Sequence, residues 1–162
     1  MIQYARFSAE EILPLIGMNM PRTQLGGFSV KTSSLRLECF KRNQSCVWCQ
    51  RKGSLFLLEA HEMGPPKGIH CFIENCQWCS YRAVEEKHLW GGRPHLNLYH
   101  VNRRGGLMMM TQDHIMPRMH GGKDVIENLQ TMCRECNQRK GSTIPKKMRH
   151  ESEIKSEVKS AS

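Results

Sequence analysis

The sequence lacks any long hydrophobic run. No stretch approaches the roughly 18 consecutive apolar residues that a membrane-spanning helix needs. The first residues, MIQYARFSAEE, carry acidic side chains where a signal peptide has its apolar segment. We therefore expect a cytoplasmic protein with no membrane contact. In that reducing compartment, cysteines are more readily metal ligands or free thiols than disulfides.

Aromatic and acidic residues are also scarce. Aromatic residues make up 7% of the 162 residues and hydrophobic residues 39%, which predicts one small domain with a thin core. Such domains often gain stability from a bound metal ion. The chain has only 15 acidic residues but 24 Lys and Arg, which gives a formal net charge of +9. This excess favours nucleic acid as a partner, although charge alone also fits a merely soluble basic protein.

Cysteine, in contrast, is abundant. Six of the eight cysteines form three Cys-x2-Cys pairs, namely Cys46 and Cys49, Cys76 and Cys79, and Cys133 and Cys136. Each pair can offer two thiolates to one Zn²⁺ from a tight turn, and four thiolates complete a structural site. One pair alone would be a weak signal, but three in a short chain favour metal binding. The spacing does not say which pairs share an ion.

The N-terminal part of the chain is expected to be an arm. Residues 1–31 contain a short helix that begins with the capping box of Ser8 and Glu11, followed by a link through Gly26 and Gly27. In residues 32–43, apolar side chains recur at helical spacing after Ser33 and Ser34. We predict that this second helix leads the chain to Cys46.

The middle and the end of the chain carry weaker patterns. Residues 59–92 are polar and rich in turn residues, which indicates a loop-rich insertion. Residues 95–101 and 107–112 resemble two strands joined by a turn at Gly105 and Gly106. Residues 143–162 form a basic and charged tail that we expect to be a frayed helix or flexible. Its charges fit a solvated terminus better than a DNA-contacting arm.

The segment TQDHIMPRMHGGKDVIENLQTMCRECNQRKGS is the most informative part of the sequence. It resembles the HNH endonuclease family, whose members share Asp-His-Ile, then Pro and a basic residue, Gly-Gly, Glu-Asn-Leu, Cys-x2-Cys-Asn and Lys-Gly. All of these elements occur here in that order. The upstream stretch FKRNQSCVWCQRKGS is similar to the first zinc knuckle of that family.

The resemblance implies an α+β fold with a small ββα-metal core, also called a His-Me finger. LMMMTQDH would be its first strand, NLQTM its second strand, and a helix would begin near Arg134. The nuclease domain would span residues 32–142, with the insertion inside it. A structural zinc ion would be held by Cys46, Cys49, Cys133 and Cys136, in preference to a pairing of the first two with Cys76 and Cys79.

The resemblance also implies four roles in the candidate site. Asp113 and Asn137 would be ligands of a catalytic metal ion, His114 the general base, and Asn128 the group that orients the base or its loop. These residue types suit the chemistry, because carboxylate and amide oxygens are ligands that Mg²⁺ or Mn²⁺ accepts and neutral imidazole can take a proton from water. Adjacent strand residues point to opposite faces, so we expect a bend at Asp113 and His114.

The remaining candidates concern DNA contacts and a second zinc site. Arg118, Arg139 and Lys140 are expected to contact DNA phosphates, whereas His95, His100 and His120 fit ordinary surface histidines. Cys71, Cys76 and Cys79 could form a second zinc site together with His61, His70 or His88. The sequence alone does not decide whether these residues bind zinc.

Together these observations predict a metal-dependent HNH endonuclease that hydrolyses phosphodiester bonds in DNA, one strand per active site. A monomer would then act as a nickase, and a homodimer or successive nicks would break both strands. The alternatives are a zinc-dependent nucleic-acid-binding protein without cleavage activity, a nuclease specific for branched DNA, and a nuclease directed at RNA. The target sequence is not predictable, nor is the biological role, whether in a phage, a mobile element, recombination or defence.

Overall fold

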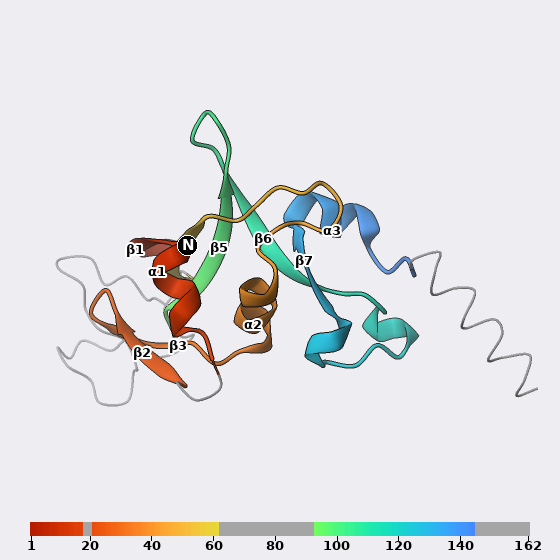
Figure 1. Ribbon diagram of the computed structural model, residues 1–162, viewed down its shortest axis with the longest axis horizontal. Coiled ribbons are helices and arrows are strands. Elements are labelled where there is room, and N and C mark those ends of the chain that lie inside the picture. Colours follow the sequence, from red (N-terminus) through yellow and green to blue (C-terminus); the bar gives the residue numbers. More distant parts are fainter. Residues whose placement is uncertain (18–20, 62–92, 145–162) are drawn as a thin grey trace, which may run out of the picture.

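The computed structural model describes residues 1–17, 21–61 and 93–144 of the chain, and these form an α+β fold built on one antiparallel sheet (Figure 1). The strand order is β1-β4-β5-β6-β7, and every neighbouring pair is antiparallel. The sheet strands are β1 (Ile2–Ser8), β4 (Leu55–Ala60), β5 (His95–Val101), β6 (Leu107–His114) and β7 (Leu129–Cys133). A separate hairpin consists of β2 (Arg22–Leu25) and β3 (Phe28–Lys31), and the α-helices are α1 (Ala9–Ile12), α2 (Leu35–Arg42) and α3 (Arg134–Lys140).

The core lies between one face of the sheet and the elements α1, α2 and β3. Register explains which strand residues face it, because Phe56 is paired with Leu98 and Leu58 with Leu96, so all four side chains point to the same side. The buried residues that complete the core include Ile12, Ile16, Val30, Leu37, Phe40, Met110 and Met132. The core thus draws on elements from Ile12 to Met132, which ties the start of the chain to its last strand.

The N-terminal segment is more than an arm. The capping box of Ser8 and Glu11 is confirmed at the start of α1, but residues 2–8 before it form β1, the edge strand paired with β4. Ile12 and Ile16 are fully buried in the core. Gly26 and Gly27 have positive φ angles and form the turn of the β2–β3 hairpin. The expected arm is therefore part of the folded domain.

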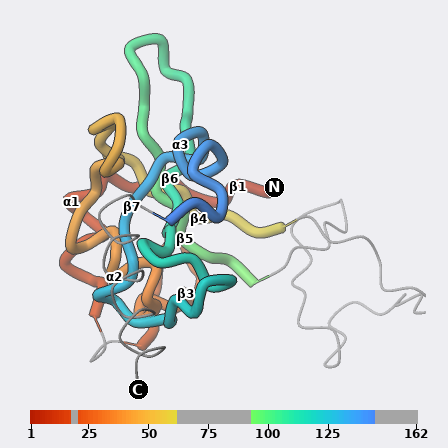
Figure 2. The backbone as a smooth tube through the Cα atoms, turned by 90° about the vertical axis from the view of Figure 1, so that its right-hand side faces the viewer, coloured from red at the N-terminus to blue at the C-terminus, as the bar shows by residue number. Residues whose placement is uncertain are grey.

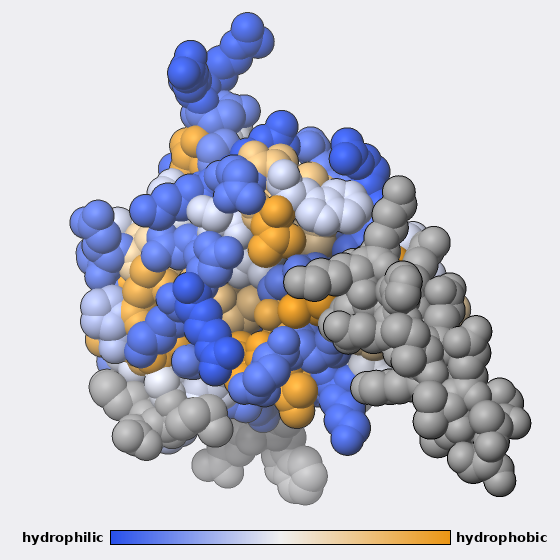
Figure 3. Space-filling model, turned by 45° about the vertical axis from the view of Figure 1, so that its right-hand side comes forward, coloured by the Kyte–Doolittle hydropathy of each residue, from blue (hydrophilic) through white to orange (hydrophobic). Residues whose placement is uncertain are grey.

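The other predicted elements match the structure closely. Helix α2 begins after Ser34, whose side chain accepts a hydrogen bond from the backbone N–H of Leu37. Strands β5 and β6 occupy the two predicted segments, and the hairpin that joins them projects beyond the rest of the molecule in two views (Figure 1 and Figure 2). Its tip is hydrophilic on the face seen in Figure 3, and it carries Arg103 and Arg104.

Two residues that were expected to belong to the insertion, Glu59 and Ala60, lie in a strand. Glu59 and Ala60 are buried residues of β4, and the expectations for Cys71, Cys76, Cys79, His70 and His88 lie outside the described residues. His61 is exposed, and its ring stacks on that of His95 with 5.4 Å between the centroids. Among the described residues, no helix is long and apolar enough to cross a membrane.

A buried polar network joins α2 to the sheet. Strand β5 pairs with β6 only from Tyr99 to Val101, so the first half of β5 has no strand partner on that side among the described residues. The Arg36 guanidinium donates there to the Leu96 carbonyl and to Asn97 Oδ1, at 2.7 and 2.6 Å. Asn97 and Tyr99 both donate to Glu59 Oε2. These bonds satisfy backbone and side-chain groups that a diverging sheet would otherwise leave unpaired.

Candidate functional site

Strands β6 and β7 and helix α3 bring together the residues singled out in the sequence. Asp113 is paired with Gln130 and His114 with Leu129 at the end of the β6–β7 ladder. Helix α3 begins at Arg134, directly after β7, and packs against both strands. The two strands and the helix therefore occupy the predicted ranges, with β7 one residue further along than NLQTM.

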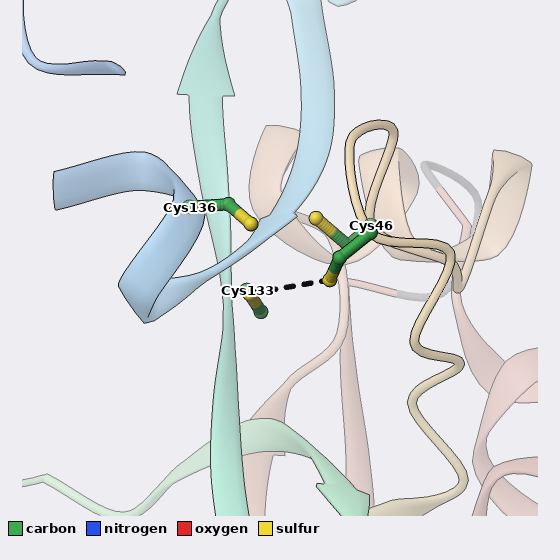
Figure 4. A group of neighbouring side chains, drawn as sticks. Cys46, Cys133 and Cys136 are labelled. Atoms are coloured by element: carbon green, nitrogen blue, oxygen red, sulfur yellow. Dashed lines mark hydrogen bonds between the residues drawn. The ribbon is translucent and has the colours of Figure 1, made fainter. Parts of the chain in front are cut away.

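Four cysteines form one cluster where the knuckle after α2 meets the start of α3. The thiol sulfurs of Cys46, Cys49, Cys133 and Cys136 all lie within 4.8 Å of one another. Figure 4 shows Cys46, Cys133 and Cys136 pointing toward a common centre. The Cys49 and Cys133 sulfurs are 3.7 Å apart, close to the roughly 3.8 Å that tetrahedral Zn–S bonds of about 2.3 Å impose. The donor set and spacing fit a structural zinc ion.

Backbone hydrogen bonds give the knuckle its shape. The N–H of Cys46 donates to the Arg51 carbonyl, and the N–H of Gln50 donates to the Cys46 carbonyl. Thr131 on β7 connects the knuckle to the other half of the cluster. Its carbonyl accepts from the N–H of Val47, and its buried hydroxyl donates to the Asn43 carbonyl at 2.6 Å. The cysteine positions are thus fixed by contacts that do not involve the thiols.

The environment of the thiols favours at least one thiolate. Burial raises the pKa of Cys46, but hydrogen bonds from the backbone at Cys49, Cys133 and Trp48 outweigh burial and lower it to about 7. Burial and the neighbouring thiols raise the pKa of Cys136 to about 12. The thiols of the cluster therefore differ in pKa. A divalent cation at their centre would stabilise the thiolate form of all four.

A second candidate site lies at the face of α3 that carries Asn137 and Lys140. A pocket of about 360 Å³ is lined by residues from the ends of β6 and α3 and the loop between β6 and β7. Asp113, His114 and Asn137 all line this pocket. The end of β6 therefore presents its adjacent Asp and His to one cavity. The side-chain amide N–H of Asn137 donates to Thr111 Oγ1 at 2.9 Å, which leaves its carbonyl oxygen available for a ligand.

The carboxylate of Asp113 is buried and has two partners. Gln130 Nε2 donates to it at 2.7 Å, and the Lys140 ammonium lies 3.1 Å from it. Lys140 is only 3% exposed, and it also donates to the His114 carbonyl at 2.8 Å. The Lys140 ammonium thus faces the candidate site and not the solvent, which does not support a contact with a DNA phosphate. A carboxylate has about four acceptor positions, so two remain for another ligand.

His114 is oriented by a residue that the sequence did not single out. Its Nε2 lies 2.6 Å from Asp124 Oδ1, and the Arg118 guanidinium donates to both oxygens of the same carboxylate. Hydrogen bonds from His114 and then from Arg118 lower the pKa of Asp124. An ionised carboxylate only accepts, so the proton of a neutral His114 ring belongs on Nε2 and its Nδ1 is the free acceptor.

Asn128 holds the loop between β6 and β7 in place. Its side-chain oxygen accepts from the N–H of Met116, and its side-chain nitrogen donates to the carbonyls of Met116 and Lys123. Gly122 is packed against this contact, because a Cβ built there would lie 1.8 Å from the Met116 carbonyl oxygen. Asn128 thus contacts the loop that carries Asp124, and not His114 itself.

Comparison with protein families agrees with this geometry. Residues 108–153 match the family model described as HNH endonuclease. This segment is similar to HNH endonucleases. The match covers less than a third of the chain, and its last part, residues 145–153, lies outside the described residues. No curated protein and no solved structure matches the chain.

The matched segment contains every pocket residue named above, and the four-cysteine cluster joins it to the upstream knuckle. Three features of the site were not anticipated from the sequence, namely Asp124 beside His114, Gln130 beside Asp113, and the burial of Lys140. The register β6–β7 could have indicated Gln130, since it lies opposite Asp113. Asp124 and Lys140 depend on the folded loop and helix and leave no comparable signal.

Proposed function

We propose that this protein is a zinc-stabilised, metal-dependent HNH endonuclease that hydrolyses phosphodiester bonds in DNA. The observation that carries the proposal is the shared pocket of Asp113, His114 and Asn137 inside the matched HNH segment. The net charge of +9 favours a polyanionic substrate. In this proposal β6, β7 and α3 form the ββα-metal core, and residues 32–142 form the nuclease domain.

His114 is the general base of the proposed reaction. Its ring faces the pocket with 16% of the side chain exposed, so it can reach a water molecule while remaining held. Asp124 fixes the ring through Nε2, which leaves Nδ1 to take the proton from the attacking water. Positioned general bases of this kind contribute about 10²- to 10⁴-fold to a rate. Asp124 is a positioning residue that acts through His114, and Arg118 restrains Asp124.

Asp113 and Asn137 are the residues that would hold a divalent metal ion such as Mg²⁺ or Mn²⁺. Their carboxylate and amide oxygens are suitable donors, and the pocket leaves room for water and a phosphate group. When bound, the ion supplies positive charge that stabilises the phosphate and the leaving oxygen. Lys140 compensates the charge of buried Asp113 and, with Gln130, fixes the orientation of its carboxylate.

The four cysteines have a structural role in this proposal. A zinc ion on Cys46, Cys49, Cys133 and Cys136 fastens the start of α3 to the knuckle after α2. Asn137 directly follows Cys136, so the same ion also fixes one metal ligand relative to β6. Zinc is thus expected to support the catalytic geometry without contacting the substrate.

The matched pair His114→Ala and His120→Ala tests the assignment of the base. His114 is the last residue of β6 and His120 lies in the loop that follows, but His120 contacts the Ser142 carbonyl and not Asp124. Cleavage of a labelled duplex should fall by about 10²- to 10⁴-fold in the first variant and stay near wild type in the second. Zinc content and DNA affinity should be unchanged in both. Wild-type cleavage by His114→Ala would refute the assignment.

The main alternative is a nucleic-acid-binding protein without cleavage activity. It requires the zinc cluster and the basic surface but has no use for a histidine held by a carboxylate beside a buried Asp. The contact of His114 with Asp124 therefore favours the enzyme. A monomer with one such pocket would nick one strand at a time.

A further inference from the structure

A second pocket lies beside the zinc knuckle, and the proposed reaction makes no use of it. Its volume is about 600 Å³, and its lining consists of Trp48, Cys49, Arg51, Glu135, Cys136, Gln138 and Arg139. It shares no lining residue with the pocket of Asp113 and His114. Helix α3 separates the two, because Asn137 and Lys140 line one pocket while Gln138 and Arg139 line the other.

Trp48 is one of the residues that line this pocket. It lies between the two knuckle cysteines in the sequence, is 50% exposed and does not belong to the core. Metal binding by Cys46 and Cys49 does not require an aromatic residue between them. The Arg139 guanidinium lies 5.8 Å from the centroid of the indole ring, in cation–π geometry. Because Trp48 is 50% exposed, part of its side chain is open to a further flat group.

The charges around this pocket favour an anionic ligand. Arg51 is paired with Glu135 at 2.8 Å, whereas no acidic side chain pairs with Arg139 within the part of the chain that the structure describes. Arg139 is exposed, so a phosphate can reach its guanidinium while it stays against the indole. An aromatic face next to a guanidinium without an acidic partner is the combination that binds a nucleobase and its phosphate.

The width of α3 sets the scale of the separation between the two pockets. An α-helix with its side chains is about 10–12 Å across, and successive phosphates of one DNA strand are about 3.4 Å apart along the axis. A strand whose phosphodiester group lies in the HNH pocket would therefore reach Trp48 after a few nucleotides. In an intact duplex the base faces are covered by their neighbours, so only an unpaired base can present one to the indole.

We propose that Trp48 and Arg139 form a stacking site for an unpaired nucleobase, a few nucleotides from the phosphodiester bond at the HNH pocket. The proposal rests on the proposed nuclease function for its choice of ligand. It gives the protein a preference for DNA that carries unpaired bases over fully paired DNA. Of the alternative functions, it favours structure-specific cleavage.

The test compares two DNA molecules that differ in one base. A labelled duplex and the same duplex with a single-base bulge are titrated with the full-length, zinc-loaded protein without added Mg²⁺, and binding is followed by fluorescence anisotropy. Wild-type protein should bind the bulged duplex more tightly. Trp48→Leu should lose about 5- to 150-fold in affinity for the bulged duplex, as expected for loss of one stacked base, and little for the paired one.

Two further variants complete the test. Trp48→Phe keeps an aromatic face and should retain most of the preference, while Leu35→Ala, at an exposed apolar residue of α2, should behave as wild type. Zinc content checks that Trp48→Leu keeps its knuckle, and if that variant does not fold, Arg139→Gln on the surface of α3 should also reduce the preference. Equal wild-type affinity for both duplexes, or equal losses on both in the variants, would overturn the proposal.

The outcome is separable from that of the nuclease proposal. A clear preference for the bulged duplex in a protein that cuts no DNA would support the stacking site and refute the nuclease. Cleavage of DNA together with an unchanged preference in Trp48→Leu and Arg139→Gln would support the nuclease and refute the stacking site.

Discussion

The side chains of Asp113 and Lys140 form a buried ion pair. Their side chains are 7% and 3% exposed, and the ammonium lies 3.1 Å from the carboxylate. Removing one partner of such a pair strongly destabilises the fold, because the other charge is then left buried and uncompensated. Asp124 and Arg118 form a different pair, since their contact lies at the surface and orients His114.

Replacing Lys140 should therefore destabilise the fold. Lys140→Met is expected to lower the free energy of unfolding by about 3–5 kcal/mol, because it strands the buried Asp113 carboxylate. Denaturant unfolding measures this, with Arg139→Met at the adjacent exposed position as the control. The double variant Asp113→Asn with Lys140→Met should regain part of the loss. Unchanged stability in the single variant would mean that the two charges are not a buried pair.

Replacing Asp124 should impair catalysis and leave the fold intact. Asp124→Asn is expected to reduce the cleavage rate by about 10- to 100-fold, as found for partners that orient a catalytic group. The pKa of Asp124 is lowered by His114 and Arg118. The Asp124 carboxylate is therefore ionised at neutral pH. Its contact with His114 is lost only when the pH falls below the lowered pKa of Asp124. The loss should therefore be similar across neutral pH, and a loss confined to acidic pH would contradict this role.

At the scale of elements, the loop between β6 and β7 positions the candidate base. The loop is closed by the three hydrogen bonds of Asn128 and by the close approach of Gly122 to Met116. It carries Asp124, whose side chain has His114 and Arg118 as its hydrogen-bond partners among the described residues. The loop conformation and the orientation of His114 are thus coupled.

A methyl group at Gly122 should disturb this loop. Gly122→Ala places Cβ against the Met116 carbonyl, so the loop must shift and Asp124 must leave His114. We expect cleavage to fall by at least about 10-fold while the zinc content and the sheet stay intact. Gly17→Ala is the matched control, since nothing lies within 4 Å of its Cβ position. Equal activity of the two variants would show that the loop does not position the base.

The secondary-structure elements could be predicted from the sequence better than the contacts between them. The capping residues Ser8 and Ser34 and the Gly-containing turns act locally, so α1, α2 and the β5–β6 hairpin could be placed from the sequence. The sequence did not reveal that residues 2–8 would pair with β4, because that pairing joins segments about fifty residues apart. For the same reason the partners of His114 and Asp113 depend on the completed fold. The exception is the cysteine cluster, where spacing and family resemblance together gave the right four residues.

At the scale of the whole molecule, the cysteine cluster adds a link between distant parts of the chain to those made by the sheet and the core. It joins the knuckle after α2 to β7 and α3, and three of its four cysteines, Cys46, Cys133 and Cys136, belong to the core. A small domain with few aromatic residues has limited apolar burial with which to hold these parts together. A zinc ion at the cluster would therefore contribute directly to folding.

Removing the metal should loosen the whole domain. We expect one zinc per Cys46–Cys49–Cys133–Cys136 cluster, and loss of cooperative unfolding in a strong chelator or in Cys46→Ser. Circular dichroism and metal analysis measure both effects. Cys39→Ala is the control, because Cys39 is buried against Thr131 but lies outside the cluster. A Cys46→Ser variant with full zinc content and wild-type unfolding would refute the structural role.

The central claim is that this molecule cuts DNA with the HNH pocket. The most direct measurement incubates the zinc-loaded protein with supercoiled plasmid and Mg²⁺ or Mn²⁺ and separates supercoiled, nicked and linear forms. Wild-type protein should convert supercoiled plasmid to the nicked form before any linear form appears, and His114→Ala should leave the plasmid supercoiled. If wild-type protein binds the plasmid but leaves it supercoiled with either metal ion, the claim is wrong.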